Sequence, residues 1–570
     1  MKLFNSLSIL LLGAAFTTKV LAAPSPCPLV GPAFPWPTPS RSNKRLKEAQ
    51  RRLTSLIEPI FKAQNGSTNS VAVQLFDTVN TAPLLQWQFT ADNIDPNLGV
   101  RTVDQNTVFR IGSVSKIWTV YLFLTQAGID PFAEPVAKYV PELQVPVSGD
   151  AIDSVQWANV TLGELASHLA GIARDYGTLD LSGNPSMGNL GFPPLQPDEI
   201  PSCGSHTPCN RTEFFNGLLQ RHATFPISAT PVYSNAAFQI LGYALEAISN
   251  DTFQNIFENQ LLKTLNLSHT FYTTPDTSLG IIPSGAASFW NMDLGDENPA
   301  GGIYSSANDM AALGRAILKN TLLDPITTRR WMKPNSHTSS LAYGVGAPWE
   351  IVSFPVPRLI DLYTKAGDIG SYSSMIALSP DHGVGFTILV AGPGGHVVVA
   401  EVADLVGQTI VPALDWVAKD QARVRFAGTY SSTNDLNSSV TIITDDEPGL
   451  RVVNWISNST DMFQSLATLR NANGTSGITI RLYPTGLQTP GKISFRALIP
   501  PDLGLSPIGP FTGSCITWAT VDSYVYGSVG LDEFVFSLDD NLDAISVSPR
   551  VLRVELQRQR GAHAEMIRSL

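Results

Sequence analysis

The sequence predicts a mixed helix-and-strand domain followed by an all-β domain, and two changes of pattern support this. Up to about residue 420, helical patterns alternate with strand-like runs and long loops rich in Gly, Pro and Asn. From Phe426 onward, short alternating runs such as GITIRLYP and DEFVFSLD are separated by Asn, Asp, Gly and Pro, which is typical of a sandwich or small barrel. A chain of 570 residues is also too long for one ordinary core.

The N-terminus has the pattern of a secretory signal peptide. Lys2 precedes an apolar run that leads to VLA before Ala23, and this run is too short to span a membrane. We therefore expect residues 1–22 to be removed on export and the mature protein to be secreted, that is, extracellular. Residues 23–44 are rich in proline and predict an extended surface segment.

The next segments predict the elements of the larger domain in order. Leucine and isoleucine at helical spacing predict a helix over residues 46–61, and the runs VAVQLFDT and LLQWQFT predict two strands. AAFQILGYALEAIS and SSANDMAALGRAIL predict further helices, SYSSMIALSPDHGVGFTILVAG a hairpin, and residues 397–420 a long amphipathic helix. The apolar run from the hairpin into this helix is interrupted by GPGG, so we assign it to the core and not to a membrane. The domains are placed at residues 45–423 and 424–570.

The composition excludes two classes of partner. A hydrophobic fraction of 43% with 15% charged residues is typical of a globular protein. The net charge of -11 opposes binding to nucleic acid phosphates and to an anionic membrane surface. We expect a small-molecule substrate as the partner, and the sequence leaves the oligomeric state open.

The cysteines and sequons fit an exported protein. Cys203 and Cys209 lie in a loop short enough to close as a small ring, which leaves Cys27 to reach Cys515. A zinc site is the weaker alternative because no pair of histidines stands nearby at ligand spacing. Possible glycosylation sites are Asn65, Asn159, Asn210, Asn250, Asn266, Asn437, Asn458 and Asn473.

The stretch FRIGSVSK contains a candidate nucleophile. Ser113 and Lys116 are three residues apart, so on a helix they share a face, whereas Ser115 projects elsewhere. A lysine can take the proton of a serine hydroxyl when burial, a second cation or a helix N-terminus lowers its pKa. Taken alone, a lone S-x-x-K more often marks a helix-capping serine and a solvated lysine.

Two further elements carry side chains suited to the same chemistry. Tyr233 and Asn235 are two residues apart, so in extended chain they face one side, where a phenol can relay a proton and an amide can bind substrate. Lys365 precedes Gly367 at the entry to the predicted hairpin, and the glycine lets a substrate approach backbone N–H groups. Taken alone, the first element fits a helix-entry turn and the second an edge-strand lysine.

In this order, S-x-x-K, Y-S-N and K-x-G form the motif set of serine β-lactamases and penicillin-binding proteins. The segments LASHLAGI, PAGGIYSSANDMAALGRAIL and YGVG add to a resemblance to the group of class C β-lactamases, D-alanyl-D-alanine peptidases and family VIII esterases, over roughly residues 45–420. The resemblance implies an α/β (α+β) catalytic domain with an antiparallel sheet covered by helices. It implies neither a metal nor an organic cofactor.

The resemblance also implies a role for each motif residue. Ser113 would be the acylated nucleophile and Lys116 its base partner, while Tyr233 would relay the proton of the leaving group and of the hydrolytic water. Asn235 would hold the acyl side of the substrate. Lys365 would help to position the proton of Tyr233 and would attract a substrate carboxylate.

The predicted oxyanion hole consists of the backbone N–H groups of Ser113 and of Asp368, which follows Gly367. Ala366 and Asp368 stand where class C enzymes usually carry Ser or Thr. Hydroxyls that help to bind a β-lactam carboxylate are therefore missing, and the charge of Asp368 opposes such a group. Lys365 is retained, whereas many esterase relatives have His or Trp there, so the pattern leaves the substrate open.

Competing hydrolase schemes lack their motifs. The chain has no E-x-x-L-N for a class A deacylating water, no H-x-H for a metallo-enzyme and no G-x-S-x-G. His168 in ASHLAG is interpreted as a core residue or a neighbour of the site. We therefore expect a glycosylated, secreted serine hydrolase that acts through a Ser113 acyl-enzyme on an ester, lactone or β-lactam-like amide. The alternatives are an acyltransferase or hydrolase of natural-product metabolism and a catalytically silent binding protein.

Overall fold

The computed structural model describes residues 27–39, 43–62, 68–146, 149–178, 180–204, 207–285, 288–355, 358–470, 474–475, 478–499, 511 and 514–559. These residues form two compact units, Val30–Gln421 and Ala422–Leu570, the second of which also includes the residues before Val30. The expected signal peptide and the sequons at Asn65 and Asn473 lie outside the described residues.

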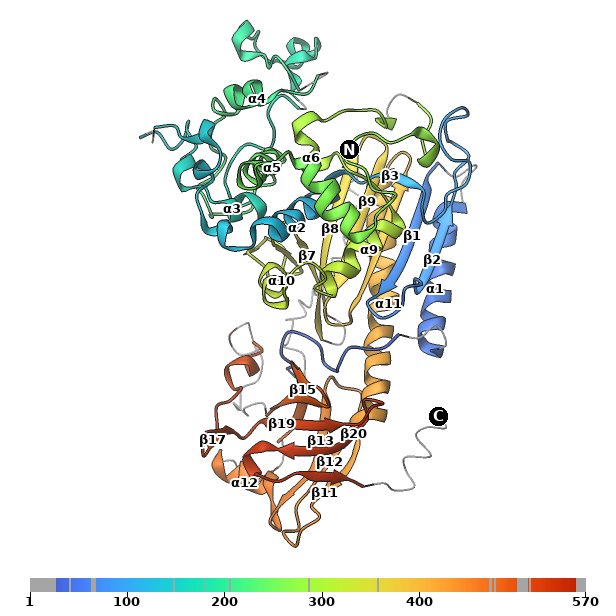
Figure 1. Ribbon diagram of the computed structural model, residues 1–570, viewed down its shortest axis with the longest axis vertical. Coiled ribbons are helices and arrows are strands. Elements are labelled where there is room, and N and C mark those ends of the chain that lie inside the picture. The colour runs from blue at the N-terminus through green and yellow to red at the C-terminus, as the bar shows by residue number, and fades with distance from the viewer. Residues whose placement is uncertain are drawn as a thin grey trace, which may run out of the picture. The chain divides into compact units, whose positions relative to one another are not determined.

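An antiparallel sheet forms the centre of the first unit (Figure 1). Its described strands lie in the order β2-β1-β10-β9-β8-β7-β6-β5, so the first strand of the unit pairs with the last. The bounds are β1 Ser70–Asp77, β2 Leu85–Phe89, β5 Ser336–His337, β6 Tyr343–Val345, β7 Glu350–Pro355, β8 Leu359–Ile369, β9 Tyr372–Ser379 and β10 Val384–Ala391. A separate short pair joins β3 (Val108–Arg110) to β4 (Tyr304–Ser306).

Both faces of the sheet are covered, because alternate residues of its strands enter two different cores. In β1, Val71, Val73 and Leu75 pack with helices α1 and α11, whereas Ala72 and Phe76 belong to the core on the opposite face. That second core contains α2, α5 and α9 and is the larger of the two. The expectation of a sheet covered by helices is confirmed, and the motif residues lie on the side of the larger core.

The helices of the first unit follow from their apolar patterns. They are α1 Lys44–Lys62, α2 Ser115–Ala127, α3 Leu162–Ala166, α4 Arg211–Leu218, α5 Ala236–Ser249, α6 Phe253–Ile256, α7 Lys263–Leu265, α8 Asn298–Gly301, α9 Ala307–Leu318, α10 Pro325–Trp331 and α11 Gly395–Phe426. By length and composition, α11 is the described helix that could cross a membrane. Val402, Val406 and Ile410 of this helix are instead buried against the sheet, as a core helix requires.

The second unit contains a closed barrel of antiparallel strands. Each strand pairs with the next along the chain, β12 pairs with both β11 and β13, and β21 returns to pair with β11. The described barrel strands are β11 Gly428–Ser431, β12 Ser439–Ile443, β13 Leu450–Ser457, β15 Ile480–Thr489, β16 Lys492–Leu498, β19 Glu533–Leu538, β20 Ala544–Pro549 and β21 Leu556–Arg558. The hairpin strand β14 (Thr460–Asp461), helix α12 (Met462–Leu469) and the pair β17 (Val525–Tyr526) and β18 (Val529–Gly530) complete the unit.

Aromatic side chains fill the interior of the barrel. Phe426, at the end of α11, lies 5.4 Å from the ring of Phe495 and 5.1 Å from that of Phe536, and Trp455 lies 5.2 Å from Phe534. The all-β prediction for this part is therefore confirmed, and of the two architectures considered the structure has the barrel.

The structure pairs Cys27 with Cys515 and Cys203 with Cys209, with Cα atoms 5.5 and 5.0 Å apart. The described sequon asparagines are all exposed to solvent, as attachment of a glycan requires; they are Asn159, Asn210, Asn250, Asn266, Asn437 and Asn458.

Candidate active site

Ser113 and Lys116 come together at the junction of a tight turn and a buried helix. Ser113 lies in the 3-10 turn η1 (Gly112–Val114), and Lys116 lies in the first turn of α2. The Lys116 Nζ donates a hydrogen bond to the Ser113 Oγ over 3.0 Å. Ser113 is half-buried, whereas Lys116 has no exposed surface. The hydroxyl can therefore meet a substrate while the amine is kept from solvent.

Ser115 has a different environment, as its phase in the sequence indicates. Its hydroxyl is buried, donates to the carbonyl of Gly112 over 2.7 Å and accepts from the backbone N–H of Ile303. This side chain fastens the turn to the segment before β4.

Two glycines allow the turn that carries Ser113 to lie directly against β8. Gly112 has a φ of +48°, and a Cβ at this position would lie 2.6 Å from the backbone nitrogen of Asp368. A Cβ at Gly367 would lie 2.6 Å from the backbone nitrogen of Ser113. The absence of both side chains therefore brings the backbones of Ser113 and Asp368 together, where the oxyanion hole is predicted.

The ammonium group of Lys116 is surrounded by acceptors. It donates to the Oδ1 of Asn235 and to the carbonyl of Ala300, both over 2.6 Å, in addition to Ser113. Burial lowers the pKa of Lys116, and the positive charge of Lys365 lowers it further, against an opposing effect of Tyr233. This lysine is easier to deprotonate than a lysine in water.

Tyr233 lies between two lysines. The ring centroid of Tyr233 is 4.9 Å from the Nζ of Lys116 and 5.2 Å from that of Lys365. Burial raises the pKa of Tyr233, but the two cations and hydrogen bonds with Lys116 and Ser113 outweigh burial, so its pKa is lowered. The phenol is thereby prepared to release and take up a proton.

His168 packs directly on the ring of Tyr233. The two rings are stacked with centroids 4.4 Å apart, and the Nδ1 of His168 accepts a hydrogen bond from the backbone N–H of Ser234. Burial and the neighbouring charges of Lys116 and Lys365 hold the pKa of His168 well below its usual range. His168 is thus a neutral packing residue beside the site, in agreement with its interpretation from the sequence.

A pair of carboxyl groups behind Asn235 is not apparent from the sequence. The Nδ2 of Asn235 donates to Asp175 over 2.8 Å, and Thr178 donates to Glu297 over 3.2 Å. Burial and the charge of Asp175 raise the pKa of Glu297 to about 7. The amide of Asn235 is therefore fixed between Lys116 and Asp175.

Glu350 is a third residue of the site that is not apparent from the sequence. It lies on β7, next to the strand that carries Lys365, and its Oε1 accepts from the Nζ of Lys365 over 2.6 Å. Its Oε2 accepts from the backbone N–H of Ala366 over 2.8 Å. Burial lowers the pKa of Lys365, but Glu350 and Tyr233 outweigh burial and raise it. Lys365 is therefore held in its charged form, whereas burial shifts Lys116 toward the neutral form.

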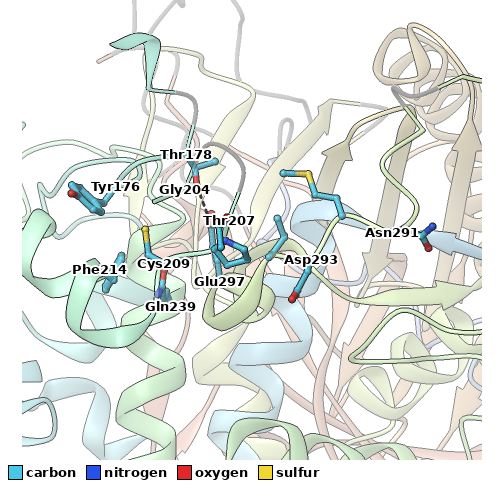
Figure 2. A pocket seen from close by; sticks show the side chains of 13 residues that line it. Tyr176, Thr178, Gly204, Thr207, Cys209, Phe214, Gln239, Asn291, Asp293 and Glu297 are labelled. Carbon is cyan, nitrogen blue, oxygen red and sulfur yellow. Dashed lines mark hydrogen bonds between the residues drawn. The ribbon is translucent and has the colours of Figure 1, made fainter. Parts of the chain in front are cut away.

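Two cavities lie beside these residues. One of about 300 Å³ is lined by Glu297, Thr178, Gln239 and Cys209 among others, and Figure 2 shows the hydrogen bond between Thr178 and Glu297 at its wall. A more open groove of about 860 Å³ is lined by Arg174 and Asp175 and by apolar side chains of the following loop, which are Leu181, Met187, Phe192, Leu195 and Ile200. Arg174 also lies over the ring of Tyr233, at 4.9 Å. The groove therefore begins at the residues that surround the predicted catalytic groups.

A Ser–His–Asp arrangement lies away from the motif residues. The Oγ of Ser379 is 2.8 Å from the Nδ1 of His382, and the Nε2 of His382 is 2.9 Å from Asp415. Ser379 and His382 are buried, and Asp415 also pairs with the buried Arg358. The imidazole presents the opposite nitrogen to the serine from that used in hydrolytic triads. This network holds the β9–β10 turn to α11 and is structural.

The sequence matches two protein families and several known proteins. The family described as "Beta-lactamase" matches residues 58–410, and that described as "Beta-lactamase-like-like, C-terminal domain" matches residues 418–560. The "Beta-lactamase-like protein" of Arthroderma benhamiae is 29% identical and covers 93% of this chain and 95% of its own length. "Probable hydrolase M10" of Phoma sp. is 26% identical over 80% of this chain and 78% of its own length.

Solved structures align with about two thirds of the chain at low identity. A class C β-lactamase aligns with a TM-score of 0.45 and 17% identity over 64% of this chain and 98% of that chain. A D-stereospecific amidohydrolase from Streptomyces sp. has a TM-score of 0.45 and 18% identity, over 62% and 98%. Because the β-lactamase match spans more than half of the sequence, the chain belongs to the β-lactamase family and is a β-lactamase-like hydrolase.

Proposed function

We propose that this protein is a serine hydrolase that forms an acyl-enzyme at Ser113 from an ester, lactone or amide and then hydrolyses it. The observation that carries the proposal is the contact of 3.0 Å between a partly accessible Ser113 Oγ and a fully buried Lys116 Nζ. A nucleophile in contact with a base that burial inclines toward the neutral form is the arrangement that acyl transfer requires.

In the acylation step, the Ser113 Oγ attacks the carbonyl carbon of the substrate and its proton passes to neutral Lys116. The backbone N–H groups of Ser113 and Asp368 stabilise the negative charge that develops on the carbonyl oxygen. As the bond to the leaving group breaks, Tyr233 donates its proton to the departing oxygen or nitrogen. Lys365, positively charged beside the ring, stabilises the phenolate that results.

In the deacylation step, the Tyr233 phenolate takes a proton from water, and the oxygen of that water attacks the acyl carbon. The ester bond to Ser113 then breaks, and Lys116 returns its proton to the Ser113 Oγ. The carboxylic acid product is released and the enzyme is regenerated, and Tyr233 and Lys116 have each returned to the protonation state in which they started.

Export and glycosylation form part of the proposal. The N-terminal pattern and the sequons support it, together with exposure of each described sequon asparagine and the two cysteine pairs. Expression in a secreting host, with analysis of the mature N-terminus and of mass before and after glycan removal, tests it. An unprocessed protein without glycans would contradict it.

The test of the catalytic proposal is a screen of short-chain esters, cephalosporins and D-amino amides with wild type, Ser113→Ala and Ser278→Ala. Ser278 is an exposed serine in a 3-10 turn outside the motif segments and provides a matched control. We expect Ser113→Ala to lose at least about 10³-fold in kcat/KM, while Ser278→Ala keeps wild-type activity. Equal activity of Ser113→Ala and wild type on every hydrolysed substrate would refute the proposal.

A further inference from the structure

The cation of the K-A-G element is already paired within the protein. Lys365 is 2% exposed, and its Nζ donates to the Oε1 of Glu350 over 2.6 Å and to the carbonyl of Ala366 over 2.7 Å. The other oxygen of Glu350 accepts from the backbone N–H of Ala366. Glu350 thus neutralises Lys365 from the adjacent strand, and the pair as a unit offers little attraction to an anion from solvent.

A second carboxylate follows at the predicted oxyanion hole. Asp368 is exposed, and its Oδ1 accepts a hydrogen bond from Ser373 over 2.6 Å. The backbone of Asp368 lies against Gly112, next to the nucleophile. Ala366 has no hydroxyl with which to bind a substrate carboxylate. An anionic substrate group on this side would therefore meet the charge of Asp368 with no free cation on β8 to offset it.

The proposed mechanism indicates that the leaving group is the part of the substrate nearest to Lys365 and β8. The leaving atom must take its proton from the hydroxyl of Tyr233, whose ring lies 5.2 Å from Lys365. The leaving group must therefore come close to Tyr233 and Lys365, and Asp368 follows three residues further along the same strand. Arg174 also lies over the Tyr233 ring, at 4.9 Å, and Asp175 offsets its charge at 3.4 Å, so this cation does not face the leaving group alone.

We infer that the site discriminates by charge on the leaving-group side, with Asp368 and the Lys365–Glu350 pair as its specificity determinants. It accepts neutral or cationic leaving groups and disfavours a carboxylate close to the scissile bond. This inference rests on the proposed serine hydrolase function and narrows its substrate class to esters, lactones and amides without an adjacent carboxylate.

The experiment uses three aryl acetates with the same acyl group: phenyl acetate, 3-acetoxybenzoate and 3-(trimethylammonio)phenyl acetate. Each kcat/KM is divided by the rate constant for hydroxide hydrolysis, which removes differences in intrinsic reactivity. We expect the neutral and cationic esters to exceed the anionic ester by at least about tenfold, and added salt to reduce this ratio. Equal or faster hydrolysis of the anionic ester by the wild type overturns the inference.

Three variants locate the discrimination. Asp368→Asn keeps an acceptor for Ser373 and the backbone N–H, so we expect it to raise the relative rate on the anionic ester at least about threefold. Glu350→Gln frees the charge of Lys365 and should shift the preference in the same direction. Asp92→Asn, at an exposed site on the β2–β3 connection, should leave the ratio unchanged. An unchanged ratio in both Asp368→Asn and Glu350→Gln also overturns the inference.

Failure of the inference and failure of the proposed function give different results. If Ser113→Ala hydrolyses phenyl acetate as fast as the wild type, the nucleophile is wrong. If Ser113→Ala is inactive but the wild type does not distinguish the charged esters, the hydrolase stands and the charge discrimination is wrong.

Discussion

Gly367→Ala is the substitution that tests the predicted oxyanion hole most selectively. The new Cβ would lie 2.6 Å from the backbone nitrogen of Ser113 and 2.7 Å from that of Val114. These are backbone atoms of the nucleophile turn, so no rotation of a flexible side chain can relieve the contact. The nearest atom of all, the carbonyl oxygen of Ile111, would lie only 2.2 Å from the new Cβ. Relief therefore requires the turn and β8 to separate, which moves the two predicted oxyanion donors apart.

The magnitude follows from that displacement. Overpacking of this kind costs about 1–3 kcal/mol in the free energy of unfolding. Loss of one well-placed oxyanion donor lowers kcat by about 10²–10³-fold, and we expect Gly367→Ala to fall in this range. The catalytic loss would therefore be much larger than the loss of folded protein.

The assay combines kcat and KM on phenyl acetate with thermal unfolding. Gly183→Ala is the matched control, because a Cβ at Gly183 has no atom within 4 Å and its φ is ordinary. This control should retain wild-type kcat and stability. A Gly367→Ala protein that is folded and keeps kcat within about threefold of wild type would refute the oxyanion-hole assignment.

Three further predictions concern the base, a titrating carboxyl and the buried network. Lys116→Met should lower kcat/KM by at least about 10³-fold, because the base is lost. The free energy of unfolding should fall by less than about 2 kcal/mol, because a buried amine is replaced by an apolar chain of similar length. Kinetics and urea unfolding of the same protein test this, and retained activity would contradict it. Because the pKa of Glu297 is raised to about 7, its contribution to stability is present below pH 4.5 and is lost as the pH rises through 7. Between pH 5 and 8, Glu297→Gln should remove roughly 2 kcal/mol of the pH dependence of the free energy of unfolding, measured with urea. The same dependence on pH in the wild type and the variant would exclude this contribution. Asp415→Asn should lower the free energy of unfolding, measured with urea, by about 3 kcal/mol, because it leaves the buried Arg358 short of a partner. The folded fraction of this variant should keep wild-type kcat. A lower kcat of the folded protein would show that the Ser379–His382–Asp415 network is not merely structural.

The sequence predicted those features that depend on the spacing of residues within one short segment. Spacing alone placed Ser113 and Lys116 on one helix face, and the family resemblance gave Tyr233 and Lys365 their roles. In the structure the Tyr233 ring lies 4.9 Å from the Nζ of Lys116 and 5.2 Å from that of Lys365. The alternation of apolar residues likewise predicted the strands of the second unit, because a period of two is written directly in the chain.

The remaining features depend on contacts that no local pattern encodes. Glu350 reaches Lys365 only because β7 and β8 pair in the register that places Glu350 opposite Thr364. Asp175 and Glu297 meet across more than a hundred residues of chain, so neither was a candidate from spacing. Whether the β runs form a sandwich or a barrel is decided by pairing of β21 with β11, a contact between the two ends of the unit.

The central claim is that Ser113 carries the acyl group during turnover, and mass spectrometry of the trapped protein tests it most directly. The purified protein is treated with a fluorophosphonate, and separately quenched in acid during phenyl acetate turnover, and fragmentation of the peptide that contains FRIGSVSK distinguishes Ser113 from Ser115. We expect one phosphonyl adduct and a transient acetyl group, both on Ser113 and both absent from Ser113→Ala. An adduct on Ser115 or elsewhere, or turnover that continues with Ser113 unmodified, would contradict it.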